Sequence, residues 1–110
     1  MKALIIKQPW IDYILNGKKT WEIRGSNTKN RGKIFLIQSG SGLIVGSCEL
    51  IDSIPLSMDM FQKESMKHCI QDINKLPYKN TYAWVLANAQ RFEKPIKYKH
   101  PKGAIIWVNV

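Results

Sequence analysis

Two neighbouring stretches decide the fold, KQPW at residues 7–10 and GKKTWEIR at residues 17–24. The residues between them place apolar side chains at the spacing of one helix face. Pro9 suits the first turn of such a helix, because its missing N–H costs nothing there. Gly17 then ends the helix. These features predict a short helix over residues 9–16.

The strand that follows this helix has two unlike faces. Side chains alternate along a strand, so Trp21 and Ile23 share one face while Glu22 and Arg24 share the other. We expect Trp21 in the core, because most aromatic residues of a small domain are buried. Opposite charges on the other face indicate a functional site as well as a scaffold.

Lys19 precedes this strand, so its ammonium can reach the same cleft as Glu22 and Arg24. Burial beside Arg24 would lower the pKa of the Lys19 amine and make it a base or nucleophile, whereas pairing with Glu22 would favour the charged form. The guanidinium of Arg24 offers a planar fork that suits a phosphate or a base edge. The alternative is a structural ion pair between Glu22 and Arg24, with Lys19 as a solvated neighbour.

This arrangement resembles the ASCH family, whose members carry a Gly-x-Lys-x-x-Glu-x-Arg signature after a short helix that often begins Gln-Pro-Trp. The signature reads here as Gly17, Lys19, Glu22 and Arg24. The resemblance continues near the C-terminus, where the closing strands of the family are matched by YAWVLAN at residues 82–88, KPI at residues 94–96 and Gly103. The resemblance therefore spans nearly the whole chain and implies a PUA-like fold.

Short runs rich in Ile, Val, Trp and Tyr predict strands, separated by turns that contain glycine. They lie at residues 3–7, 20–24, 33–38, 43–54, 81–90, 96–98 and 104–110, with a basic connection at residues 88–94. A second helix is expected within residues 58–74, with Ser57 as its N-cap. We therefore predict an α+β class, a small, mostly antiparallel PUA-like β-barrel with two short helices.

The composition bounds the class of protein. A chain of 110 residues, 45% hydrophobic and 23% charged, suits a single ASCH domain over residues 1–110. No apolar run approaches the roughly 20 residues of a membrane helix, and the first seven residues are too short for a signal peptide, so we expect a cytoplasmic protein. Cys48 and Cys69, like His68 and His100, lack metal-ligand spacing. We expect inert thiols, no metal and no cofactor.

The net charge of +9 is concentrated at the two ends of the chain. Residues 1–34 hold eight basic and two acidic residues. Residues 35–87 hold four basic and five acidic residues, and residues 88–110 hold five basic residues and one acidic residue. If the two ends pair in the sheet, these cations gather on one side and form a patch suited to RNA phosphates. The alternative is a solvated lysine-rich surface that serves solubility.

Three further residues bear on the choice between binding and catalysis. Trp10 and Tyr82 are open to either a core position or a cleft, where they could stack on a nucleobase. Acetylcytidine amidohydrolases, a related branch, use a lysine that Lys19 matches, a threonine where this chain has Glu22, and a distant glutamate for which Glu64 is the candidate. The presence of Glu22 in place of that threonine weakens the match to the amidohydrolases. The alternative for Glu64 is a solvated position on the helix.

The resemblance implies RNA binding, and ribonuclease activity is associated with some members of the family. We therefore predict that a basic cleft binds RNA or a nucleotide. Its ligand-binding residues are Lys7, Trp10, Lys19, Glu22, Arg24 and Tyr82. The alternative is a metal-independent hydrolase of a modified nucleoside or of RNA, in which Lys19 and Glu22 are catalytic. A protein-interaction domain is the third hypothesis. A closed pocket of nucleoside size would favour the enzyme and an open basic groove the binding module.

Overall fold

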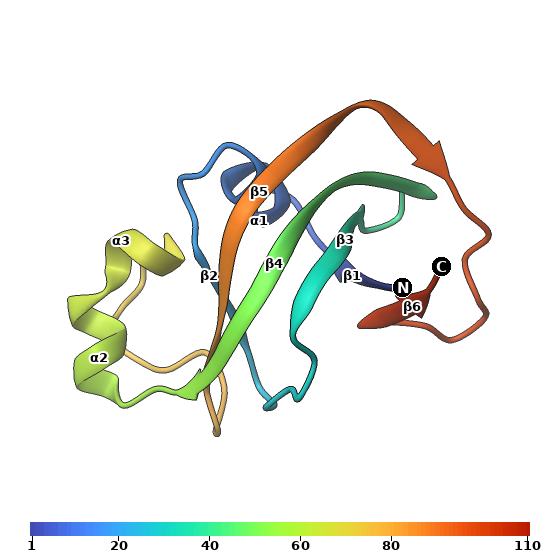
Figure 1. Cartoon of the computed structure of the whole chain (residues 1–110). Coiled ribbons are helices and arrows are strands. Elements are labelled where there is room, and N and C mark those ends of the chain that lie inside the picture. The colour runs from blue at the N-terminus through green and yellow to red at the C-terminus, as the bar shows by residue number, and fades with distance from the viewer.

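The computed structural model describes residues 1–110, which form six strands and three short helices (Figure 1). In chain order the elements are β1 (Lys2–Ile6), α1 (Trp10–Leu15), β2 (Trp21–Arg24), β3 (Gly32–Gln38), β4 (Leu43–Pro55), α2 (Met58–Lys63), α3 (Ser65–His68), β5 (Tyr82–Lys97) and β6 (Trp107–Asn109). The mixed α+β class is thereby confirmed.

All six strands belong to one sheet, in the order β2-β5-β4-β3-β1-β6. Neighbouring strands are antiparallel except β1 and β3, which run parallel. The long strands β4 and β5 arch across the molecule, with α2 and α3 at one end and both termini beside β6 at the other (Figure 1). The sheet is mostly antiparallel, as expected, but its hydrogen bonds do not close a complete barrel, because β2 and β6 remain edges.

The prediction of a single second helix was wrong. The segment forms α2 and α3, which meet at Glu64, and the second of them ends at His68. Cys69 has a left-handed backbone with φ of 63°, which stops the helix and turns the chain back toward β2. Met66 of α3 points away from the core, since it is 88% exposed. Ser57 does cap α2, where its hydroxyl accepts a hydrogen bond from the Met60 N–H at 3.2 Å.

The predicted basic connection at residues 88–94 was also wrong, because this segment continues β5. It pairs with β4 through several β-bulges, and Asn88 absorbs the irregularity with φ of 52°. The expected strands at 81–90 and 96–98 are therefore one strand, whereas the last strand is shorter than predicted and covers only Trp107–Asn109.

Helix α1 packs on the sheet through the apolar face that its sequence predicts. Its residues Ile11, Ile14 and Leu15 are buried in the main core. Gly46 permits this approach, since a Cβ there would lie 2.5 Å from the Leu15 Cδ2 and 2.4 Å from the Gln90 carbonyl oxygen. The end of α1 is therefore fixed against β4 and β5, and with it the start of the segment that carries Lys19.

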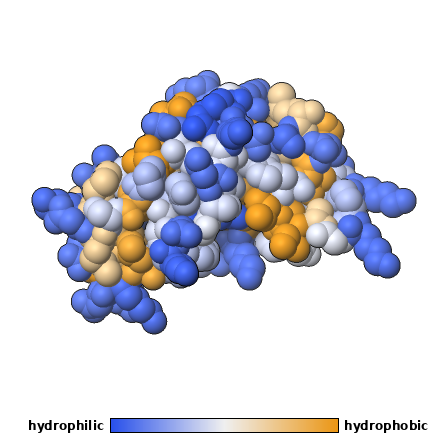
Figure 2. All heavy atoms as spheres, turned by 90° about the horizontal axis from the view of Figure 1, so that it is seen from below, coloured by the Kyte–Doolittle hydropathy of each residue, from blue (hydrophilic) through white to orange (hydrophobic).

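The two chain ends pair, as the charge argument required. Strand β1 lies antiparallel to β6, and the Val110 N–H donates to the Met1 carbonyl at 2.9 Å. Seen from below the view of Figure 1, hydrophilic side chains cover most of the surface, and hydrophobic residues form separate small patches (Figure 2). None of the three helices has the length and hydrophobicity to cross a membrane.

Candidate functional site

The two faces of β2 differ as the alternation predicts. Trp21 and Ile23 are buried in an apolar cluster with Phe61 and Leu56. On the other face, Glu22 and Arg24 lie opposite Trp84 and Tyr82 of β5. Strand β2 is an edge of the sheet, and the Arg24 side chain spans a gap between its polar face and β1.

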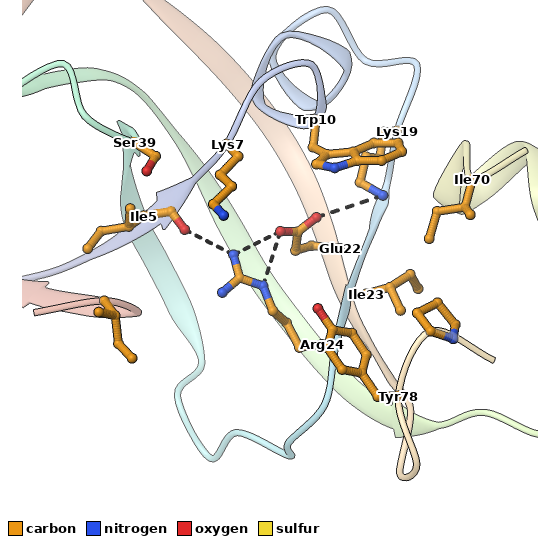
Figure 3. A pocket seen from close by; sticks show the side chains of 12 residues that line it. Ile5, Lys7, Trp10, Lys19, Glu22, Ile23, Arg24, Ser39, Ile70 and Tyr78 are labelled. Atoms are coloured by element: carbon orange, nitrogen blue, oxygen red, sulfur yellow. Dashed lines mark hydrogen bonds and ion pairs between the residues drawn. The ribbon is translucent and has the colours of Figure 1, made fainter.

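A cavity of about 440 Å³ occupies this gap (Figure 3). Its wall comes from β1, the start of α1, β2, the turn after β3, the segment at residues 69–81 and the residues before β6. The lining residues are Ile5, Lys7, Trp10, Lys19, Glu22, Ile23, Arg24, Ser39, Ile70, Pro77, Tyr78 and Ile105. This volume lies within the range of small-ligand pockets.

Arg24 and Glu22 form a tight ion pair on the cavity floor. The Glu22 Oε2 accepts hydrogen bonds from Arg24 Nη2 at 2.8 Å and from Arg24 Nε at 3.1 Å. Arg24 Nη2 also donates to the Ile5 carbonyl oxygen at 3.0 Å, and its guanidinium carbon lies 5.4 Å from the centre of the Trp84 ring. The Arg24 side chain therefore bridges from β2 to β1, where the backbone makes no closing hydrogen bonds.

Lys19 is almost completely buried, with 2% of its surface exposed. Its ammonium donates to the His68 carbonyl oxygen, lies 3.8 Å from Glu22 Oε1 and sits 4.8 Å from the centre of the Trp10 ring. Burial lowers the pKa of the Lys19 amine, and the nearby Glu22 carboxylate partly opposes that shift. Of the two influences that the sequence left open, burial is therefore the larger.

The backbone around Lys19 is held from three sides. The Lys19 N–H donates to the Tyr13 carbonyl at 2.9 Å, the Thr20 N–H donates to the Lys67 carbonyl at 2.9 Å, and the Leu86 N–H donates to the Thr20 carbonyl at 2.8 Å. These bonds tie the residue to α1, α3 and β5, so its side chain enters the cavity from a fixed position.

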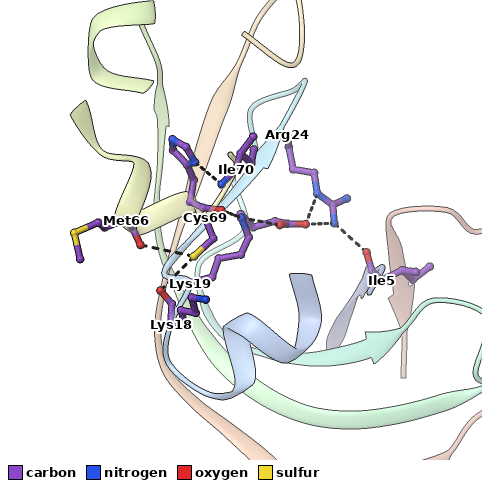
Figure 4. Close-up of polar contacts among 9 residues, drawn as sticks. Ile5, Lys18, Lys19, Arg24, Met66, Cys69 and Ile70 are labelled. Atoms are coloured by element: carbon purple, nitrogen blue, oxygen red, sulfur yellow. Dashed lines mark hydrogen bonds and ion pairs between the residues drawn. The ribbon is translucent and has the colours of Figure 1, made fainter. Parts of the chain in front are cut away.

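His68 supports this arrangement through its carbonyl oxygen, and Cys69 and Ile70, which follow it, lie beside Lys18 and Lys19 (Figure 4). Its buried ring stacks on Phe61 with centres 4.3 Å apart; Nδ1 accepts from the Ile70 N–H at 2.9 Å and Nε2 lies 2.7 Å from the Phe61 carbonyl. Because Nδ1 accepts, the proton sits on Nε2 and the imidazole is neutral. Burial lowers the pKa of His68, which agrees with that neutral form. A fixed ring places the His68 carbonyl where it receives Lys19.

Several polar groups of the cavity remain free for a ligand. Lys7 makes no ion pair, and Arg24 uses only Nε and Nη2 within the protein. No buried side-chain nitrogen or oxygen lacks a partner, so the unbonded Arg24 Nη1 and the unbonded indole N–H of Trp10 are both reached by solvent. With Lys7, Lys19, Arg24 and a single carboxylate, the cavity carries excess positive charge and free donors, which suits an anionic ligand rich in acceptors.

Five of the six predicted ligand-binding residues line this cavity, and the sixth does not. Lys7, Trp10, Lys19, Glu22 and Arg24 converge there. Tyr82 instead lies across the strand pair from Arg24, and its half-buried side chain packs against the main core.

Glu64 also lies elsewhere. It sits where α2 meets α3 and pairs with Lys67 at 3.0 Å, outside the cavity wall. The second carboxylate that an amidohydrolase site would require is therefore not supplied by Glu64.

Tyr78 and Ile70 line the cavity but were missed by sequence reasoning. Both come from the segment at residues 69–81, which has no periodicity and is placed only by tertiary contacts. A weak signal was available at Gly25, directly after the charged strand. A Cβ there would lie 2.9 Å from the Tyr78 ring, so glycine allows that ring to approach β2.

No group of three or more His, Cys, Asp or Glu side chains is placed to hold a metal ion. Both cysteines are free, and burial raises the pKa of Cys48 to about 12, which keeps it a thiol. Neither contributes to the cavity wall.

Comparison with known proteins agrees with this geometry. The ASCH domain family model matches residues 4–96. The crystal structure of the ASCH protein from Zymomonas mobilis superimposes with a TM-score of 0.72 at 14% identity, covering 87% of this chain and 72% of that one. A serine-to-alanine variant of that protein gives a TM-score of 0.75 at 12% identity, covering 99% of this chain and 87% of that one. Comparison with curated protein sequences finds no match.

Proposed function

The chain belongs to the ASCH domain family, and from this membership we propose that its cavity binds RNA through one nucleotide unit. RNA binding is the usual inference for the family. The observation that supports it in this chain is the set of side chains that line the cavity. Lys7, Lys19 and Arg24 meet with one carboxylate and the indole of Trp10 in a cavity of about 440 Å³. Such a cavity offers charge for a phosphate and hydrogen-bonding groups for a base edge.

The bonds within the site support different tasks for its cations. Lys19 and Arg24 are held by internal partners, so they present fixed donors that a base or ribose can meet in one orientation. Lys7 is free of such bonds and stands at the cavity wall, where it suits a phosphate. The Tyr78 and Trp10 rings supply the apolar surface that a base needs for stacking.

The experiment is a calorimetric titration of the protein with a nucleoside monophosphate and with a short single-stranded RNA. We expect binding of both, weaker at higher salt because counterions are released from the RNA. Arg24→Ala should lose most of the affinity, while Lys63→Ala, in an exposed pair with Asp59 on α2, serves as the matched control. Absence of binding at low salt would overturn the proposal.

The burial of Lys19 favours a second function, hydrolysis of an acyl group on a modified nucleoside. A lowered pKa raises the fraction of the amine that is neutral, and a neutral amine can accept a proton from water as the water oxygen attacks the acyl carbon. Passing that proton to the departing nitrogen then breaks the carbon–nitrogen bond and leaves a carboxylic acid and the free base. Arg24 would fix the substrate, and Glu22 would hold Lys19.

Mass spectrometry of nucleosides incubated with the protein separates the two functions. An enzyme should release product from at least one acylated nucleoside, and Lys19→Met should lower the rate by about a hundred- to ten-thousand-fold. A binding module should convert none, and its Lys19→Met variant should differ in affinity alone. Activity that persists unchanged in Lys19→Met would place the chemistry outside this cavity.

A further inference from the structure

A second cavity adjoins the first and shares part of its wall. It has a volume of about 470 Å³ and is lined in common with the first by Ile5, Lys7, Ser39 and Ile105. Its remaining lining comes from the glycine turn after β3 and from the loop between β5 and β6, through Gly40, Gly42, Tyr98, His100 and Ala104. The two cavities are therefore neighbouring compartments that share one wall.

The glycine turn supplies free backbone donors to the second cavity. Within this turn, the N–H of Ser39 bonds to Ile6, that of Ser41 to Gln38 and that of Leu43 to the Ser41 hydroxyl. The N–H groups of Gly40 and Gly42 make no hydrogen bond in the protein. Gly40, Gly42 and Lys7 line the same cavity, so two unpaired N–H groups and a free ammonium are available there to an anion.

The opposite wall of the second cavity is braced. Tyr98 O–H lies 2.7 Å from His100 Nδ1, and His100 Nε2 lies 2.9 Å from the Ala104 carbonyl, which only an Nε2–H can satisfy as donor. The Ala104 N–H donates to the Pro101 carbonyl at 3.2 Å. These bonds within the loop position its groups by contacts inside the protein.

Ile105 stands at the boundary between the two compartments and is 79% exposed. An apolar side chain this exposed, on the wall that two cavities share, gains from contact with a flat apolar surface such as a nucleobase. Lys7 lies on the same shared wall. The boundary thus combines an apolar side chain, which suits a base, with a cation, which suits the adjoining phosphate.

Lysines on the segment that supplies Tyr98 and His100 to the second cavity add positive charge. The chain from β5 into the loop carries Lys94, Lys97, Lys99 and Lys102, and none of the four makes an ion pair. Their charges are available to a polyanion and extend the positive surface beyond the first cavity.

We propose that the two cavities form one groove for single-stranded RNA that holds two successive nucleotides, with Lys7 on the phosphate that links them and Ile105 between their bases. The proposal rests on the nucleotide-binding function of the first cavity and specifies its ligand as a strand, not a free nucleotide. The second nucleotide lies against the glycine turn and the His100 loop.

The test compares affinity for adenosine monophosphate with affinity for the dinucleotide and trinucleotide of adenosine, and repeats the series with uridine. We expect the dinucleotide to bind about tenfold more tightly than the monophosphate, since one further base and its ribose gain contacts. His100→Ala and Ile105→Ser should each bring the ratio of the two affinities down toward one. Lys63→Ala should keep the wild-type ratio.

The outcomes separate this proposal from the one it rests on. If the monophosphate and the dinucleotide bind equally, the groove is refuted while the first cavity stands. A dinucleotide preference that survives in both His100→Ala and Ile105→Ser would refute it as well, because the extra affinity would then come from diffuse charge. If no member of either series binds, the proposed function itself fails.

Discussion

The cations of this protein fall into two groups that differ in how they are held. Lys19 and Arg24 are anchored by a carbonyl oxygen each and by the shared carboxylate of Glu22. Lys7, Lys29 and Lys33 make no ion pair at all. An anchored cation offers a donor in one direction and can select a ligand, whereas a free one offers charge that salt screens. On the proposed function, the anchored cations would therefore select the ligand, and the free cations would attract any polyanion.

The anchored group depends most on Glu22, and its loss should have the largest effect. Glu22→Gln leaves Lys19 and Arg24 close together without their carboxylate, and breaking a buried ion pair in this way costs about 3–5 kcal/mol in the free energy of unfolding. Urea unfolding measures the loss. The matched control is Glu64→Gln, which removes the exposed pair with Lys67 and should cost less than about 1 kcal/mol. Equal losses would mean that the Glu22 cluster is solvated.

Arg24 should dominate ligand affinity among the individual cations. Arg24→Ala removes a charged, oriented donor and should weaken binding of a nucleoside monophosphate by about tenfold to a hundredfold. Lys2→Ala, at an exposed position on β1, should change it by less than about threefold. Arg24→Lys keeps the charge without the planar fork and should fall between them. Identical affinities in all three variants would mean that only overall charge matters.

His68 should make stability fall in acid. Burial lowers its pKa in the folded protein, so below about pH 6.5 the unfolded chain binds a proton that the folded one does not. The free energy of unfolding should then decrease by at most about 1.4 kcal/mol per pH unit as pH falls, and stay level above that value. His68→Gln should lose this slope in urea titrations from pH 7 to pH 5. A slope that is unchanged in the variant would assign it to other groups.

The free cations should have the smallest effect on any single ligand. Changing Lys29, Arg31 and Lys33 together to alanine should weaken RNA several-fold and reduce the salt dependence of the logarithm of affinity by about 1.4, or 0.7 for each phosphate lost. We count two phosphates because Arg31 already lies 3.6 Å from Asp52. Affinity for a monophosphate should stay constant, and a parallel loss of it would show that these residues reach the cavity.

The sequence was most informative where local pattern and tertiary contact agree. Strand alternation correctly separated Trp21 from Glu22 and Arg24, and the helical spacing of Ile11 and Ile14 matched their burial. These patterns depend only on the period of each element. The mixed class and the antiparallel pairing followed from the same signal and from the family resemblance.

The second half of the site could not be predicted from pattern. Residues 69–81 have no period, and their path depends on the His68 ring, which accepts the Ile70 N–H and so fixes a turn that no local rule indicates. The position of Tyr78 on the cavity wall follows from that turn. The sequence left Tyr82 open between a core position and a cleft, and only the tertiary contacts place it against the main core and outside the cavity wall.

A ligand that enters between the β2 edge and β1 should perturb the tryptophans unequally, and three of the four tryptophans can report on it. Trp10 lines the cavity with a free indole N–H, Trp21 lies buried on the opposite face of β2, and the Trp84 indole donates to the Ser26 carbonyl at 2.9 Å. The measurement is the set of indole N–H signals in a ¹⁵N-labelled NMR titration with adenosine monophosphate. We predict that the Trp10 signal moves most and saturates while the Trp21 signal stays in place. A titration in which the Trp10 signal does not move, while backbone signals of residues 29–33 do, would contradict the account.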